Sequence, residues 1–244
     1  MTMALSIPFL PPVGKPGAPL DMPVVYFDDF VTSGYEASSA SKFSQAADTA
    51  DWHLQQTGTA THALSVDGVS SVVIGTSASD NDLTECQLCG EAFALAAGKT
   101  LIWEMRFHIE DVTATDWFVG MAITDTSMLA ACSDYIGFGN TADAADIYAI
   151  NGKDDTGEIA DGPTASAGQT LTDTGIDLVN NTYVTVRVEV SGTSKARFYV
   201  DGALKATHTT NLPDNEAMTP SFGIRCTGAA EKITVDYVLA TIDR

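Results

Sequence analysis

The stretch Leu101-Ile-Trp-Glu-Met-Arg-Phe-His-Ile109 decides the fold class, because apolar and polar side chains alternate along it without a break. A period of two turns one set of side chains toward a core and the other toward solvent, as in a half-buried antiparallel strand. Residues 182–190 and 231–242 repeat the pattern, and Asp201-Gly202 is a two-residue hairpin turn. Helix signals are few, with one short turn expected over 126–132 and another over 44–50. The sequence therefore predicts an all-β protein, a sandwich of two antiparallel sheets.

Composition narrows the classes of partner. The chain has 244 residues, of which 45% are apolar, enough for one large β domain with its own core. It carries 12 Lys and Arg against 32 Asp and Glu, a formal charge of −20. Such a chain repels phosphate backbones and anionic membrane surfaces, so neither a nucleic acid nor a membrane is expected as a partner. The first ten residues carry no positive charge, which is not typical of an export signal.

The N-terminal segment differs from the rest of the chain. Six of the nine prolines fall within the first 23 residues, and proline excludes both helix and central strand. We therefore expect an extended, Pro-rich arm over residues 1–23, followed by a single domain over 24–244. Two interpretations of the arm stay open: a flexible leader, or an arm that packs on a partner chain. In the second, the contact residues are the apolar side chains of the arm, Leu5, Ile7, Phe9, Leu10 and Val13.

The cysteines and the acidic loops do not have the spacing of a metal site. Cys86-x-x-Cys89 has no second ligand pair, and with Cys132 and Cys226 these residues are expected to be buried structural thiols. The acidic loops lack the spacing of an EF-hand and are expected to be a solvated surface. No metal ion and no cofactor are therefore predicted.

A catalytic site is also not expected. Hydrolysis of a glycosidic bond requires two carboxylates at a defined separation. The nearest local candidate, Glu158-Ile-Ala-Asp161, lies in a loop, and Glu104 is expected to pair with Arg106 two residues on. The four histidines are scattered. The sequence predicts that the protein is not an enzyme and has no catalytic residues.

The last third of the chain resembles the concanavalin A-like (laminin-G-like) jelly roll. The resemblance rests on residues 183–190, the hairpin Phe198-Tyr-Val-Asp-Gly202 and the closing strand Val235-Asp-Tyr-Val238. It implies a jelly-roll sandwich. Laminarinases and lichenases of this superfamily carry a Glu-x-Asp-x-x-Glu strand as nucleophile and acid, and this motif is absent here. Asp236 matches the position associated with a structural calcium in those enzymes.

A second resemblance covers residues 93–107, 117–125, 135–138 and 212–222, which are similar to segments of uncharacterised tailed-phage virion proteins. It implies a capsid decoration (cement) protein at the virion surface, synthesised in the host cytoplasm. Its partners would be the major capsid protein and other copies of itself, in a homo-oligomer expected to be a trimer. The arm and one edge of the sandwich would contact the shell. The alternatives are a carbohydrate-binding (lectin-like) module or a receptor-binding head, with a glycan as ligand, and, third, a glycoside hydrolase.

Overall fold

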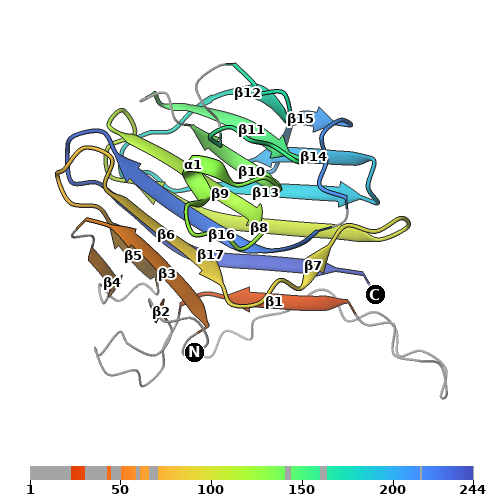
Figure 1. Cartoon of the computed structure of the whole chain (residues 1–244), viewed down its shortest axis with the longest axis horizontal. Coiled ribbons are helices and arrows are strands. Elements are labelled where there is room, and N and C mark those ends of the chain that lie inside the picture. Colours follow the sequence, from red (N-terminus) through yellow and green to blue (C-terminus); the bar gives the residue numbers. More distant parts are fainter. Residues whose placement is uncertain are drawn as a thin grey trace, which may run out of the picture.

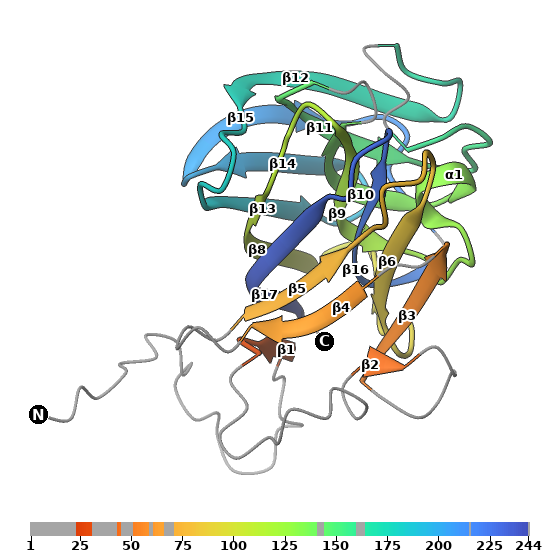
Figure 2. The ribbon, with the colours of Figure 1, turned by 90° about the vertical axis from the view of Figure 1, so that its left-hand side faces the viewer.

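The computed structural model describes residues 23–30, 43–44, 51–58, 61–65, 71–140, 144–159, 164–214 and 216–243. These residues form two β-sheets packed face to face (Figures 1 and 2). The predicted all-β fold, a jelly-roll sandwich of two antiparallel sheets, is confirmed. The division into an arm over 1–23 and a domain over 24–244 stays a prediction, because residues 1–22 lie outside the described part.

Sheet A, as we name it, contains eight strands. In spatial order they are β15 (Ala203–His208), β14 (Lys195–Val200), β13 (Val184–Ser191), β8 (Thr100–Ile109), β17 (Lys232–Ile242), β5 (Ser71–Gly75) and β4 (Thr61–Ser65), with β1 (Val24–Asp28) paired to β17. All of these pairs are antiparallel. Asp201 and Gly202 have φ of 48° and 77° between β14 and β15, which confirms the predicted hairpin turn.

Sheet B contains nine strands. In order they are β12 (Gln169–Asp177), β11 (Asp146–Gly152), β10 (Tyr135–Asn140), β9 (Thr115–Ala122), β16 (Ala217–Cys226), β6 (Leu83–Leu88), β3 (Trp52–Thr57) and β2 (Phe43–Ser44), with β7 (Phe93–Ala94) paired to β16. Only the short β2–β3 pair of described strands is parallel. The described helix, α1 (Met128–Ala131), lies within the turn expected over 126–132. No helix among the described residues is long and apolar enough to cross a membrane.

The main core lies between the two sheets. The alternation in β8 places Trp103, Met105 and Phe107 there, each 0% exposed, as the sequence predicts. Trp117 of β9 faces them from sheet B, with its ring centroid 5.5 Å from that of Phe107. Aromatic contacts of this kind add to the stabilisation by apolar burial.

A second, smaller apolar layer covers the outer face of sheet B. Phe118 and Tyr135 point away from the main core and pack with Met128 and Leu129 of α1 and with Ile159. Figure 2 shows α1 on this outer side of the sheet. Every residue of β9 and β10 is therefore buried, and these strands do not alternate between core and solvent.

The prediction of buried thiols holds for three of the four cysteines. Cys86, Cys132 and Cys226 are buried, and burial raises the pKa of the Cys86 thiol. The prediction is wrong for Cys89, which is exposed. The reason is that β6 ends at Leu88, so Cys89 belongs to the turn that follows.

Candidate functional site

The outer face of sheet B is closed over its central strands by the segment that contains α1. The fully buried carboxylate of Glu85, on β6, accepts the backbone N–H groups of Met128 (3.0 Å) and Leu129 (2.7 Å). Gln87, two residues along the same face, donates to the Ile123 carbonyl (2.9 Å) and accepts the N–H of Asp125 (2.9 Å). Side chains of β6 thus hold residues 123–129 across the sheet.

Burial changes the acidity of Glu85. Its removal from water raises the pKa of the carboxyl from 4.5 to about 7, against the opposing effect of the two backbone N–H groups and of the more distant Arg225. A carboxyl of this kind is half protonated near neutral pH, which is the condition for a general acid or base.

Near Glu85 lies a partly buried ion-pair cluster. Arg225 of β16 donates through Nε to Asp116 (2.8 Å) and through Nη1 and Nη2 to Glu158 (3.2 and 3.0 Å). Burial disfavours the charge, but the bonds to the two carboxylates outweigh it and raise the pKa of Arg225. Glu158, the catalytic candidate of the sequence, is thus an ion-pair partner, and Asp161 lies outside the described residues.

The outer face of sheet B opens to solvent at β3. His53 and Gln55 are partly exposed there, and the strand register places them beside Gln87 and Glu85. With Leu54, Gln56 and Thr126 they line an open hollow of about 330 Å³. The Gln55 amide donates to the Asp125 carbonyl (3.0 Å), which fixes the wall that the 123–127 segment contributes.

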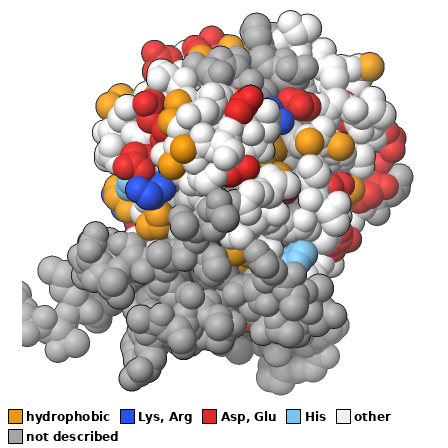
Figure 3. All heavy atoms as spheres, turned by 60° about the vertical axis from the view of Figure 1, so that its left-hand side comes forward, with side chains coloured by type: hydrophobic (Ala, Val, Ile, Leu, Met, Phe, Trp, Pro, Cys, Tyr) orange, Lys and Arg blue, Asp and Glu red, His pale blue; other side chains and the backbone are white. Residues whose placement is uncertain are grey.

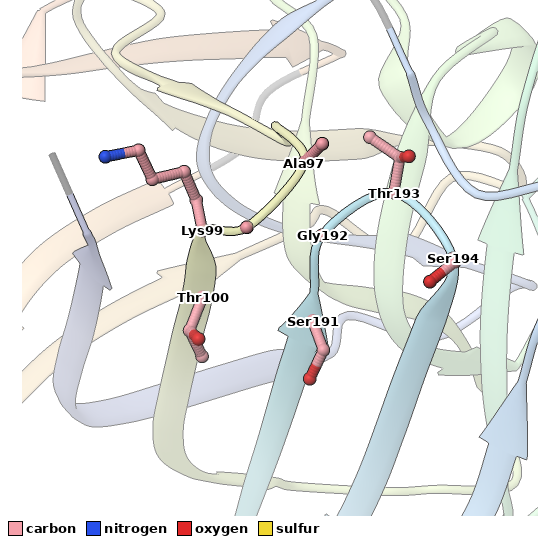
Figure 4. A pocket seen from close by; sticks show the side chains of 8 residues that line it. Ala97, Lys99, Thr100, Ser191, Gly192, Thr193 and Ser194 are labelled. Atoms are coloured by element: carbon pink, nitrogen blue, oxygen red, sulfur yellow. The ribbon is translucent and has the colours of Figure 1, made fainter.

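A second hollow, of about 400 Å³, lies between two turns at the end of sheet A. Residues 97–100 form one wall and residues 191–194 the other, and the N–H of Gly192 donates to the Lys99 carbonyl (2.8 Å). Figure 4 shows the hydroxyl groups of this hollow, with the Lys99 ammonium group extending away from Ser191 and Ser194. The hollow is open, its lining is about evenly polar and apolar, and no carboxylate lines it.

Two predicted contacts of sheet A are different in the structure. Glu104 accepts a hydrogen bond from the Tyr237 hydroxyl (2.7 Å) rather than pairing with Arg106. Arg106 instead pairs with Asp236, because a bulge in β17 turns this carboxylate toward it. The Asp236 carboxylate, matched from the sequence to a calcium position, is therefore occupied by a guanidinium group. In the described part of the chain, His, Cys, Asp and Glu form no group of three that could hold a metal ion.

The contact residues predicted in the arm, Leu5, Ile7, Phe9, Leu10 and Val13, lie outside the described residues. The structure instead brings together side chains that the sequence analysis did not single out. Glu85, Asp116 and Arg225 are far apart in the sequence, and the pairing of β6, β16 and β9 makes them neighbours. Short sequence motifs do not reveal such a group, because its members are neighbours only in the folded sheet.

No family model and no curated protein sequence matches this chain. Solved structures do. The endo-1,3-beta-glucanase of Streptomyces sioyaensis aligns with 94% of this chain and 99% of its own at 15% identity, with a TM-score of 0.58. The beta-glucanase of Bacillus licheniformis aligns over 88% and 97% at 14% identity, with a TM-score of 0.54. The endo-beta-1,4-glucuronan lyase of Trichoderma reesei aligns over 89% and 94% at 8% identity, also with a TM-score of 0.54.

These likenesses define the class of the protein by fold: a concanavalin A-like jelly roll. They also correct the prediction that the protein is not an enzyme, because the similar structures named above are themselves enzymes. That prediction relied on the absence of a local carboxylate motif, whereas the fold gathers carboxylates from separate strands. The capsid role, the trimer and the virion location stay predictions, since neither the structure nor the comparisons test them.

Proposed function

We propose that the protein binds a carbohydrate polymer, and that the hollow at His53, Gln55 and Thr126 is its binding site. One observation carries the proposal. The second apolar layer closes the outer face of sheet B over β9 and β10, and leaves it open at β3. The hollow at β3 is therefore a part of that face that a ligand can reach. Of the functions predicted from the sequence, we therefore prefer the carbohydrate-binding module to the capsid protein.

The chemistry of the lining supports a ligand rich in hydroxyl groups. An amide offers both a donor and an acceptor, and the Thr126 hydroxyl and the His53 ring can each act as either. About 330 Å³ is within the range of about 300–1,000 Å³ that is typical of small-ligand sites. The Gln55 amide and the 123–127 backbone are already fixed by their hydrogen bond, so little ordering is needed on binding.

Affinity electrophoresis in gels that contain laminarin or another neutral β-glucan tests the proposal. We expect retardation of the wild-type protein, and at least a threefold weaker effect for His53→Ala and Thr126→Ala. Thr113→Ala, at an exposed position that lines neither hollow, is the matched control and should behave as wild type. The proposal would be contradicted if none of these glucans retarded the wild-type protein, or if Thr126→Ala and Thr113→Ala weakened the retardation equally.

A second candidate function is cleavage of the bound polymer, and the acidity of Glu85 favours it. The Glu85 carboxyl lies next to Gln55 of the hollow in the strand register, and burial raises its pKa to about 7. Once the α1 segment moves aside, Glu85 would protonate the glycosidic oxygen as the C–O bond breaks, while a water molecule adds to the anomeric carbon and returns a proton to Glu85. Release of new reducing ends from laminarin is the measurement. Activity that Glu85→Gln abolishes and Thr113→Ala preserves supports this function, and activity that survives Glu85→Gln rules out this role for Glu85.

A further inference from the structure

The basic side chains of this acidic protein divide into two groups. Nine of the twelve Lys and Arg residues lie in the described part of the chain. Five of the nine form salt bridges with Asp or Glu: Arg106, Lys153, Arg187, Arg225 and Lys232. The other four form no salt bridge with a described acid: Lys99, Lys195, Arg197 and Lys205.

Three of these four side chains, Lys195, Arg197 and Lys205, lie at the edge of sheet A that β14 and β15 form, and we call them the basic cluster. Lys195 is the first residue of β14, and Arg197 follows on the outer face of this strand, because its neighbours Ala196 and Phe198 are buried in the core. Lys205 lies at the bulge of β15, opposite Phe198 and Tyr199. Three to four residues of β14, at about 3.3 Å each, separate the level of Lys195 from that of Lys205, so the cluster extends over about 10–13 Å along the strands. Lys99 precedes β8, and its ammonium group extends away from Ser191 and Ser194, so it is not part of the cluster (Figure 4).

Polar groups of the second hollow adjoin the cluster. Thr100, Ser191 and Lys195 lie in one row across β8, β13 and β14, and Thr193 and Ser194 form the turn beside them. Figure 4 shows that these hydroxyl-bearing side chains come from both walls of the hollow. The hydroxyl groups of Thr100 and Ser191 therefore lie on the same face of the sheet as Lys195, the first member of the cluster.

The nearest acids are already engaged. Glu189 accepts the Tyr199 hydroxyl (2.9 Å) and pairs with Arg187 (3.0 Å), whose guanidinium lies over the Tyr199 ring at 4.5 Å. On the β17 side, Asp243 accepts the N–H of Thr100 (3.0 Å). Three neighbouring basic side chains that form no salt bridge with a described acid leave a local positive charge that an external anion can neutralise.

We propose that the basic cluster and the adjoining hollow bind an acidic polysaccharide. Its carboxylate or sulfate groups contact the cluster, and its hydroxyl groups contact Thr100, Ser191 and Ser194. The length of the cluster, about 10–13 Å, fits an extended polymer, since a single small anion would contact only one or two of the three cations. That the polymer is a carbohydrate rests on the proposed function, but the site is a different one. The net charge of −20 disfavours a nucleic acid here.

Calorimetric titration with alginate oligosaccharides, which carry carboxylates, and with carrageenan oligosaccharides, which carry sulfates, tests the proposal and separates the two chemistries. The test variant is Arg197→Gln/Lys205→Gln. The control, Lys153→Gln/Lys232→Gln, removes the same charge from two ion-paired lysines elsewhere. We expect at least a tenfold loss of affinity in the test variant and less than twofold in the control, with melting temperatures like that of the wild type. Raising NaCl from 50 to 200 mM should weaken wild-type binding.

Three results would overturn the proposal: no binding of either acidic oligosaccharide by the wild type, equal losses in the test and control variants, or a concentration-dependent dimer that only the test variant abolishes. The last result, from sedimentation velocity, would make a second copy of the chain the occupant. Laminarin binding should be unchanged in Arg197→Gln/Lys205→Gln. The two sites can therefore fail separately, because Thr126→Ala affects only the laminarin measurement.

Discussion

At the scale of single residues, two buried titratable side chains oppose each other in their pH dependence. Glu85 is held beside the N–H groups of Met128 and Leu129, and burial raises its pKa to about 7. His208 lies between the sheets, with Nδ1 2.6 Å from Asn151 Oδ1 and Nε2 2.9 Å from Thr172 Oγ1, and burial lowers its pKa to about 4. Burial favours the uncharged form of both groups. Glu85 therefore destabilises the fold at high pH, where it ionises, and His208 destabilises it at low pH, where it becomes protonated.

The first prediction concerns Glu85→Gln. The folded pKa of about 7 lies above the ordinary value of 4.5, so the carboxyl contributes stability that is fully present below pH 4.5 and is lost as the pH rises through 7. The loss amounts to at most about 3 kcal/mol. The free energy of unfolding of each protein is measured with urea at pH 5 and at pH 8. Between pH 5 and pH 8 the wild type should lose about 1–3 kcal/mol more than Glu85→Gln does, because only the wild type must ionise a buried carboxyl. A difference that is independent of pH would contradict the assignment.

His208→Gln should show the opposite dependence. The folded pKa of about 4 lies below the ordinary 6.5, so the neutral ring contributes stability that is fully present above pH 6.5 and is lost as the pH falls toward 4. Between pH 8 and pH 5 the free energy of unfolding of the wild type should fall by about 2 kcal/mol more than that of the variant. The measurement is urea unfolding at the two pH values, and identical losses in both proteins would show that another group titrates.

At the scale of elements, α1 and its flanking segment decide which part of sheet B is accessible. Leu129 is fully buried against Phe118 and Tyr135 in the second apolar layer. Leu129→Ala should therefore lower the free energy of unfolding by about 2–4 kcal/mol. Ala131, the exposed last residue of α1, offers the control Ala131→Ser, with an expected change within about 0.5 kcal/mol. Chemical denaturation measures the free energy of unfolding of both variants. A smaller destabilisation by Leu129→Ala than by Ala131→Ser would show that the layer is not packed as described.

The strands differ in how well the sequence predicts them. β8, β13 and β17 face a core on one side and solvent on the other, so their period of two is visible in the sequence. β9 and β10 are buried on both sides, and a buried strand shows no such period. The candidate site was not predictable, because strand register brings Glu85 next to Gln55 and Gly223, and register depends on the whole sheet.

At the scale of the whole molecule, the two sheets present different outer faces. Sheet B is closed by its own chain over β9 and β10, whereas the outer face of sheet A carries the basic cluster. On the face shown in Figure 3, acidic side chains outnumber basic ones. The basic cluster lies at β14 and β15 of sheet A, and the hollow at β3 lies on sheet B, so an acidic and a neutral ligand would meet different surfaces.

The predicted domain boundary can also be tested at this scale. A chain that begins at Met22 retains every described strand. Since its prolines exclude the arm from helix and central strand, removing it should leave the melting temperature within about 2 °C of the full-length value. Calorimetry measures the change. A fall of 10 °C or more would show that residues 1–21 contribute to the core of the domain.

The most direct test of carbohydrate binding is the crystal structure of the protein with a laminarin oligosaccharide. The proposed function predicts sugar density in the hollow, with hydroxyl groups within hydrogen-bond distance of Gln55 and Thr126 and with residues 123–127 in place. An oligosaccharide bound on another surface, or an empty hollow at a sugar concentration that saturates binding in solution, would contradict it.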